Sequence, residues 1–285
     1  MKKLLLYITQ KIDYPILHFS ALSGGDISAI YLLETSYQKF VLKTNKSPQA
    51  LAMFQAEQVG LTAIAATATI KTPTIYLCET HQNIAFLLME YVPSKKPSEK
   101  DFERLGYALG QLHQATNHTF GWQEDNFIGS LNQSNTNHNS WLDFYIKERL
   151  HPQFQLALKT QLLTKKEIPT QESLFQKGTP LFKDIQPVLL HGDLWSGNYL
   201  IAKNGIPYLI DSATYYGHSE VDIAMTRLFG GFGQAFYDAY HELHPLQTTS
   251  AIRQDWYQLY YLLVHLNLFG RGYYRQVKRV LARCF

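Results

Sequence analysis

The sequence predicts an α+β protein of two lobes, a small β-rich lobe at the N-terminus followed by a larger, mainly α-helical lobe. Residues 29–92 contain several short runs of β-branched, aromatic and other apolar residues, which are typical of strands. From residue 101 onward the apolar residues recur three and four positions apart, as on one face of a helix. Pro93 and Pro97 separate the two patterns, so we expect an N-terminal lobe at residues 1–92 and a C-terminal lobe at 93–285.

The N-terminal lobe is expected to combine a sheet with two helices. The first twelve residues predict an amphipathic helix rather than a signal peptide, because their apolar stretch covers only residues 4–8 and no cleavage site follows. The runs "AIYLLET" and "YQKFVLK" predict a hairpin, and residues 47–65 predict a helix capped by Ser47 with Pro48 in its first turn. "TPTIYLC" and "IAFLLMEYV" predict two more strands, the second of them buried.

Composition argues against several classes of protein. The 285 residues carry a formal net charge of +3, which is too weak to predict a nucleic-acid track. The two cysteines, Cys78 and Cys284, lie far apart and outside any metal-ligand spacing, which fits a reducing cytoplasm. The apolar run at 261–269 is too short to cross a bilayer. We therefore expect a soluble, cytoplasmic protein whose oligomeric state the sequence leaves open.

The motif "HGDLWSGN" at 191–198 places polar groups directly after the apolar run 188–190. Asn204-Gly205 then stands between two apolar runs, a strong hairpin signal that returns Asp211 to the neighbourhood of Asn198. Asp193, Asn198 and Asp211 would thus present carboxylate and amide oxygens at one loop edge. Such oxygens suit a hard cation such as Mg²⁺ with phosphate as its other ligand, so Asn198 and Asp211 are predicted metal ligands.

The spacing of Asp193 and Asn198 matches the catalytic loop of kinases, in which the Asp orients a hydroxyl and accepts its proton. Asp193 is therefore the predicted catalytic base, and His191 is expected to brace the loop backbone. Gly192 stands where protein kinases carry an arginine that reads an activation-loop phosphate, which favours a small-molecule acceptor.

Other parts of a phosphoryl-transfer site have candidates in the N-terminal lobe. Lys43 ends a predicted strand, and Glu57 lies on an apolar helix stripe where a carboxylate is costly unless paired, so the two are expected to form an ion pair at the nucleotide's phosphates. Gly24 and Gly25 could form a turn over the phosphates, although a plain turn is an equal alternative. The backbone at 90–92 (Glu90, Tyr91, Val92) could read an adenine by main-chain hydrogen bonds, although a strand that connects two lobes would look the same without a ligand.

With these residues in place, the chain resembles the fructosamine kinase (ketosamine-3-kinase) family, within the protein-kinase-like and aminoglycoside phosphotransferase fold. The resemblance runs over essentially the whole length and includes "FQAEQVGLTAI", "LGQLH", "FGWQEDNFIGSLNQSN", "LLHGDLWSGN" and "IDSATYYGHSEVDIAM". It implies ATP- and Mg²⁺-dependent transfer of phosphate to the 3-hydroxyl of a ketoamine, free or on a protein lysine, as a deglycation activity. It also implies the roles given above for Asp193, Asn198, Asp211, Lys43 and Glu57.

The chain departs from the family pattern in two places. Ser212 replaces the proline usual after the metal-binding aspartate, and the glycine turn lacks a cysteine that many members carry. Ser212 loses rigidity but leaves the neighbouring carboxylate in place.

For the acceptor the sequence offers candidates for which packing is an equal alternative. Trp195 could stack on a sugar, and others sit in family-like blocks: Asp125, Asn126, Trp141, Arg149 and His218. Asp222 and Arg227 are expected to anchor the catalytic loop. Two rival hypotheses stay open: a phosphotransferase for another hydroxyl acceptor, such as an aminoglycoside or choline-like compound, and a nucleotide-binding pseudokinase.

Overall fold

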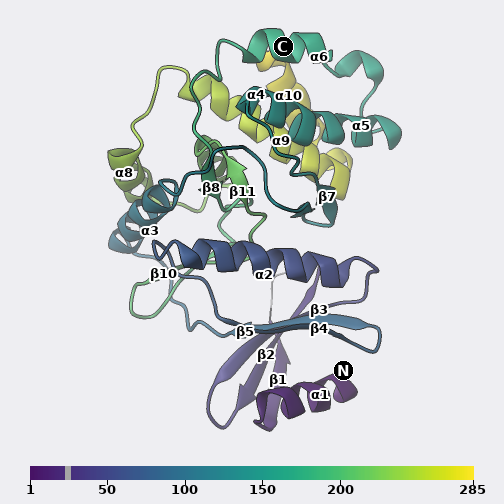
Figure 1. Cartoon of the computed structure of the whole chain (residues 1–285), viewed down its shortest axis with the longest axis vertical. Coiled ribbons are helices and arrows are strands. Elements are labelled where there is room, and N and C mark those ends of the chain that lie inside the picture. Colours follow the sequence, from purple (N-terminus) through teal and green to yellow (C-terminus); the bar gives the residue numbers. More distant parts are fainter. Residues whose placement is uncertain (23–26) are drawn as a thin grey trace.

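The computed structural model describes residues 1–22 and 27–285 and has the predicted class, with an antiparallel sheet at the N-terminal end and helices at the other (Figure 1). In the described residues the large sheet has the strand order β1-β2-β3-β5-β4. Its strands are β1 (Ile16–Ala21), β2 (Ala29–Thr35), β3 (Lys39–Asn45), β4 (Ile75–His81) and β5 (Ile84–Glu90). The predicted hairpin is confirmed as β2 and β3, and β5 is the buried central strand.

Two helices cover the two faces of this sheet. Helix α1 (Lys2–Ile12) packs Leu4 and Ile8 against the face that contains Phe40 and Leu42. Helix α2 (Ala50–Ala66) covers the other face and lies between the sheet and the helical region (Figure 1). The predicted cap of α2 was wrong. The helix begins after Gln49, and Ser47 instead lies in a preceding turn in which its amide donates to Asn45 Oδ1 at 2.8 Å.

The C-terminal region is mainly helical. Ser98 caps α3 (Glu99–Leu112) through a reciprocal pair of bonds with Asp101, and α3 packs closely on α8 (Gln234–Leu243). The other helices are α4 (Trp141–Phe144), a π-helical turn (Tyr145–Leu150), α5 (His151–Lys159), α6 (Gln171–Gly178), α7 (Glu220–Phe229), α9 (Ser250–Phe269) and α10 (Tyr274–Cys284). Short 3₁₀ turns occupy Lys165–Glu167 and Arg271–Tyr273. No helix in the described part of the chain is long and apolar enough to cross a membrane.

Three short strand pairs lie in the helical region. They are β6 (Asn126–Ile128) with β7 (Leu131–Gln133), β8 (Val188–Leu190) with β11 (Tyr215–Gly217), and β9 (Tyr199–Ile201) with β10 (Pro207–Leu209). The β9–β10 pair is the hairpin that Asn204-Gly205 predicts, and Gly205 takes the left-handed backbone (φ +82°) that this turn needs. Strand β8 leads into the HGDLWSGN motif, and β10 leads to Asp211. The residues that follow the two strands lie next to each other, since the His191 ring bonds the Ile210 carbonyl.

Helix α2 connects the two cores. Near its start, Ala50 and Phe54 pack against Leu87 and Met89 of the sheet. Near its end, Ile64 belongs to the core of the helical region, together with residues such as Leu105, Leu189, Leu194 and Leu209. The helix is therefore fixed at both ends, and its middle turn, which carries Glu57, faces the junction.

Candidate active site

The HGDLWSGN loop is held from behind by a buried carboxylate. Asp222, in the first turn of α7, accepts hydrogen bonds from the amides of His191 at 2.8 Å and Gly192 at 2.9 Å. The His191 ring donates from Nε2 to the Ile210 carbonyl at 2.8 Å and accepts at Nδ1 from the Asp193 amide at 3.2 Å. These bonds require a neutral imidazole, and burial lowers the pKa of His191 accordingly. His191 thus braces the loop backbone, as expected from its position.

Gly192 has a backbone reason for being glycine. Its φ is +84°, and a Cβ built at this position would lie 2.1 Å from the carbonyl oxygen of Ala213. The Gly192 carbonyl in turn accepts from the Tyr261 hydroxyl at 2.8 Å. A side chain cannot be added here unless residues 211–213 move.

The amide of Asn198 has a defined orientation. Its Nδ2 faces three acceptors: the Asp193 carbonyl at 2.8 Å, Asp193 Oδ2 at 3.3 Å and the Asp211 carbonyl at 3.4 Å. Because all three neighbours are acceptors, the amide oxygen must point the other way, and it has no partner among residues 1–22 and 27–285. Asn198 therefore ties the two aspartate segments together and keeps one oxygen free for a ligand.

The N-terminal lobe contributes one cation to this edge. The Lys43 ammonium, on β3, donates to Glu57 Oε2 and to Asp211 Oδ1, each at 2.7 Å. Lys43 is only 8% exposed. Burial opposes its charge, but Asp211 and Glu57 outweigh burial and raise the pKa of Lys43. Burial likewise opposes the charge of Asp211, and Lys43 lowers the pKa of that carboxyl overall. Asp211 holds its position with a left-handed backbone, φ 56°, which is uncommon outside glycine.

Carboxyl groups outnumber the Lys43 ammonium at this site. Burial first, and then the charges of Asp211 and Asp222, raise the pKa of Asp193 to about 7. No group of three or more His, Cys, Asp or Glu side chains in the described ranges could hold a metal without help. The free amide oxygen of Asn198 and the carboxylate of Asp211 are nevertheless hard oxygen donors on two residues that the bond from Asn198 Nδ2 to the Asp211 carbonyl holds together. This is the kind of donor set that a magnesium ion shared with phosphate uses.

The segment after β5 connects the two lobes. The amide of Glu90 donates to the Thr74 carbonyl at 2.8 Å, and the amide of Tyr91 donates to the Lys39 carbonyl at 3.4 Å. The amide of Val92 donates to no acceptor in the described part of the chain. Glu90 and Tyr91 also line a cavity of about 580 Å³, but Lys43 and Asp193 are not among its lining residues. Gly24 and Gly25 lie outside the described residues.

Trp195 and Asp125 are the exposed members of the predicted acceptor set. The Trp195 side chain is 40% exposed and covers Gly197, where an added Cβ would lie 2.5 Å from the indole. Glycine at 197 therefore allows the ring to fold over the loop, two positions from Asp193. Asp125 accepts from the Asn135 amide at 2.8 Å and is otherwise exposed.

Other members of the acceptor set are used in packing. Asn126 is buried and bonds the Thr214 carbonyl at 2.8 Å and Gln133 Nε2 at 2.7 Å. Arg149 is fully buried, donates to Asn135 Oδ1 at 2.7 Å and stacks on the Tyr215 ring. Arg227 was wrongly expected at the catalytic loop: it is exposed and stacks on Tyr237.

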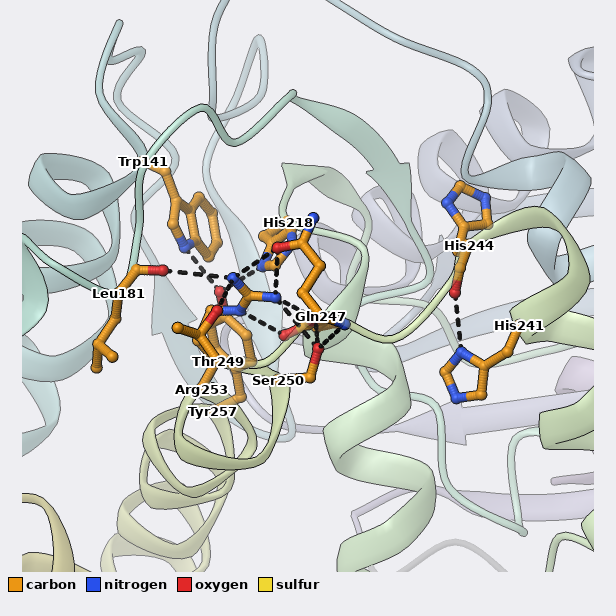
Figure 2. Close-up of polar contacts among 11 residues, drawn as sticks. Trp141, Leu181, His218, His241, His244, Gln247, Thr249, Ser250, Arg253 and Tyr257 are labelled. Carbon is orange, nitrogen blue, oxygen red and sulfur yellow. Dashed lines mark hydrogen bonds and ion pairs between the residues drawn. The ribbon is translucent and has the colours of Figure 1, made fainter.

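His218 belongs to a polar chain that Figure 2 shows beside α9. The Tyr257 hydroxyl accepts from Trp141 Nε1 at 2.9 Å and donates to His218 Nδ1 at 2.6 Å. Burial lowers the pKa of His218 to about 3, so the ring is neutral. Trp141 is itself buried, so this member of the predicted acceptor set is also used in packing.

Two supporting groups escaped the sequence analysis. His113, at the end of α3, places Nε2 3.2 Å from Asp222 Oδ2 and Nδ1 2.8 Å from the Tyr240 hydroxyl. Arg253, buried in α9, donates to Glu220 of α7 at 2.8 Å, so it fixes the start of the helix that carries Asp222. It also donates to Thr249 and to the Leu181 carbonyl (Figure 2). His113 could have been suspected from the sequence, because a histidine at the end of an apolar helix stripe needs a polar partner. Nothing in the sequence around Arg253 indicates its role.

These features define a class. A sheet lobe carrying a Lys–Glu pair, joined to a helical lobe carrying an Asp–Asn loop and a second aspartate, is the protein-kinase-like phosphotransferase fold. The same fold occurs in a solved aminoglycoside phosphotransferase, APH(4)-Ia, with a TM-score of 0.62 and 16% identity over 99% of this chain and 98% of that one. At that identity the likeness concerns the fold alone.

Comparison with known sequences narrows the class to a family. The sequence model described as fructosamine kinase matches residues 3–285. A probable ketoamine kinase of Synechocystis is 41% identical over 267 residues, covering 93% of this chain and 89% of that protein. The chloroplastic protein-ribulosamine 3-kinase of Arabidopsis thaliana is 38% identical, covering 90% and 79%. A crystal structure from Haemophilus somnus that carries the fructosamine-3-kinase name has a TM-score of 0.89 at 26% identity, covering 100% and 98%. The chain belongs to the fructosamine kinase family.

Proposed function

We propose that this protein is an ATP-dependent kinase that transfers the γ-phosphate to the 3-hydroxyl of a ketoamine, a fructosamine or ribulosamine that is free or attached to a protein lysine. The observation that carries the proposal is the junction of the lobes. There Lys43 bonds Asp211 across 168 residues of sequence, and Asn198 bonds both aspartate segments. This arrangement provides a cation for phosphate, oxygens for a metal and a carboxylate for a hydroxyl.

ATP is the proposed phosphate donor. Lys43 would hold the nucleotide's phosphates, with Glu57 keeping the ammonium in position. The free amide of Val92 supports an adenine next to residues 90–92, because the two preceding amides are already used in the sheet. Gly24 and Gly25 remain predicted to cover the phosphates.

Mg²⁺ is the proposed metal, held by Asn198 through its amide oxygen and by Asp211 through its carboxylate. When bound, it would neutralise charge on the phosphates and on the leaving ADP. The residues fit this role because Asn198 keeps its amide oxygen free while Nδ2 donates to the main-chain carbonyl of Asp211, which holds the two residues next to each other.

Asp193 is the proposed base. Its Oδ2 lies near Asn198 Nδ2, which leaves Oδ1 to accept a hydrogen bond from the acceptor hydroxyl. As the hydroxyl oxygen bonds to the γ-phosphorus, the bond to the bridging oxygen of ADP breaks and the proton passes to Asp193. A pKa raised to about 7 suits a group that must take up a proton near neutral pH and release it afterwards.

The ketoamine acceptor is supported by the relatives, which carry the names ketoamine kinase and protein-ribulosamine 3-kinase. The exposed indole of Trp195 beside the base suits stacking on the sugar portion. We accordingly propose a deglycation role in the cytoplasm.

Neither rival is favoured. The likeness to aminoglycoside phosphotransferases rests on about 15% identity and concerns the fold. A pseudokinase would be expected to have lost one of the five phosphotransfer residues, and the sequence retains them all: Lys43, Glu57, Asp193, Asn198 and Asp211.

A substrate panel tests the proposal. The protein is incubated with ATP, Mg²⁺ and ribulosamines, fructosamines, an aminoglycoside or choline, and both ADP and the phosphorylated product are measured. We expect 3-phosphorylated ketoamine, with an Asp193→Asn protein as the inactive control. The acceptor assignment would be abandoned if the aminoglycoside or choline gave the faster turnover, or if no ketoamine gave product above that control.

A further inference from the structure

The middle turn of α2 lies directly against the segment that follows Asp211. A Cβ built on Gly60 would lie 2.6 Å from Ser212 Oγ, 2.8 Å from Thr214 Oγ1 and 3.0 Å from Thr214 Cβ. Both hydroxyl oxygens are buried and have no hydrogen-bond partner within residues 1–22 and 27–285. The space opposite Gly60 is therefore already filled by side-chain atoms of the helical lobe.

Gly60 shares a helix face with Glu57, because residues three apart on a helix are neighbours. Glu57 reaches the Lys43 ammonium at 2.7 Å, and the same ammonium reaches Asp211, which directly precedes Ser212. The contact at Gly60 thus joins α2 to this segment directly, and one turn earlier Glu57 is joined to it through Lys43. If α2 moved away from residues 212–214, Glu57 would move away from Lys43 and Asp211.

We infer that Gly60 is a positioning residue of the phosphotransfer site: the absence of a side chain lets α2 seat on Ser212 and Thr214, and this seat sets Glu57 against Lys43. The inference rests on the proposed function in that Lys43 holds nucleotide phosphate. It gives Ser212 a role of its own, since its hydroxyl forms part of the seat. It also means that Glu57 stays paired with Lys43 because α2 is packed against Ser212 and Thr214.

The simpler alternative is that Gly60 is an ordinary helix residue. Glycine is disfavoured in the interior of a helix relative to alanine, so Gly60→Ala would then raise the melting temperature and leave activity unchanged. The two explanations predict opposite signs for stability. The difference in sign makes a small substitution informative.

The first experiment compares Gly60→Ala and Gly60→Val in the full chain. The hydroxyls of Ser212 and Thr214 can rotate away from one methyl group. For alanine we therefore expect a modest fall in both the melting temperature and kcat/KM for ATP. For valine we expect kcat/KM for ATP to fall about 100-fold, because a misplacement of about 1 Å at a phosphotransfer site can cost that much. A Ser212→Ala/Thr214→Ala background removes both hydroxyls and should restore most of the loss caused by Gly60→Ala.

Gly110→Ala is the matched control. Gly110 also lies inside a helix, and its Cβ would come 2.9 Å from Leu243 Cδ1, but it belongs to the α3–α8 contact away from the site. This variant should change the melting temperature without changing kcat or the KM for ATP. An equal effect of both substitutions on kcat/KM would show that Gly60 acts only through general stability.

A double-mutant cycle with Glu57→Gln separates positioning from packing. Affinity for MgADP is measured by calorimetry, so that the readout does not depend on the acceptor. Gly60→Val should weaken MgADP binding in the wild-type background and add little once Glu57 is replaced. Additive effects, or unchanged MgADP affinity in Gly60→Val, would overturn the inference. If ketoamines are not phosphorylated and yet the cycle is non-additive, the acceptor assignment fails while the role of Gly60 stands.

Discussion

The two sides of the active site are built differently. On the helical side, the loop with Asp193 is held by several bonds, most of them buried: Asp222 binds two of its amides, the His191 ring binds the backbone on both sides, and Tyr261 binds Gly192. On the sheet side, a single ammonium is held by two carboxylates. The loop is therefore fixed before any ligand binds, whereas the position of Lys43 depends on charge balance and on the seat of α2. Substitutions behind the loop should affect folding, and those around Lys43 should affect nucleotide binding.

The largest effect on rate is expected for Asp193→Asn. The amide keeps the shape of the side chain but cannot take up the hydroxyl proton, so kcat should fall on the order of 10²–10⁴-fold. The loop is held by other residues, so MgADP affinity should stay near that of the wild type. Steady-state kinetics and calorimetry check both parts. An asparagine variant with wild-type kcat would remove Asp193 from the role of base.

The same variant tests the pH dependence of stability. The pKa of Asp193 is raised to about 7 in the folded protein and is ordinary in the unfolded chain, so the folded state keeps a proton that the unfolded state has lost between about pH 4 and 7. The contribution of Asp193 to the stability of the metal-free protein should therefore fall as pH rises through that window. Asp193→Asn should flatten this dependence and melt at a higher temperature than the wild type at pH 8. Thermal scans of both proteins from pH 5 to 8 measure the difference between their melting temperatures. A difference that does not grow in favour of Asp193→Asn as pH rises would contradict the assignment.

The support behind the loop is tested by Asp222→Ala. Removal of this fully buried carboxylate leaves the amides of His191 and Gly192 without acceptors and Nε2 of His113 without its partner. Breaking a buried charged network of this kind costs about 3–5 kcal/mol, so the free energy of unfolding should fall by that amount. Denaturant titration provides the value. A loss of activity with unchanged stability would mean that Asp222 acts in the chemistry and not through the loop.

On the sheet side, Lys43→Met keeps the length of the side chain and removes its charge. Asp211 and Glu57 would then face each other without a cation between them, and the phosphates would lose their ammonium. We expect the KM for ATP to rise by about tenfold or more, at about 1.5–3 kcal/mol for a charged hydrogen bond. The change in unfolding free energy should be smaller than for Asp222→Ala. If Lys43→Met lowers the unfolding free energy more than Asp222→Ala does, the proposed difference between the two sides of the active site is wrong.

The parts that sequence predicted correctly are local. The β2–β3 hairpin and the hairpin around Asn204-Gly205 follow from short patterns, and the meeting of Asn198 with Asp211 follows from the second of these. The Lys43–Glu57 pair could be predicted because an acidic residue on an apolar helix face needs a partner. The lobe boundary between residues 92 and 93 stays a prediction.

What sequence missed depends on contacts between distant segments. His113 meets Asp222 across 109 residues, and Asn126 meets the Thr214 carbonyl across 88, so no local spacing reveals either bond. The cap of α2 was misplaced because Asn45 draws Ser47 into a turn before the helix begins. Arg227 was misassigned since helical spacing alone does not show that Tyr237 supplies a ring for it to stack on.

The smallest effect is expected for Trp195→Ala, which removes a loop side chain that takes no part in the loop's support. The indole is exposed and rests on Gly197, so its loss should leave the melting temperature and the KM for ATP near the wild-type values. If the ring stacks on the sugar, the KM for the ketoamine should rise about fivefold to tenfold, in line with an aromatic contact of about 1 kcal/mol. Trp195→Phe should recover most of that loss, because a phenyl ring also offers a flat face. An unchanged ketoamine KM in Trp195→Ala would mean that the indole merely covers the loop, and the acceptor would then have to be held by other residues around Asp193.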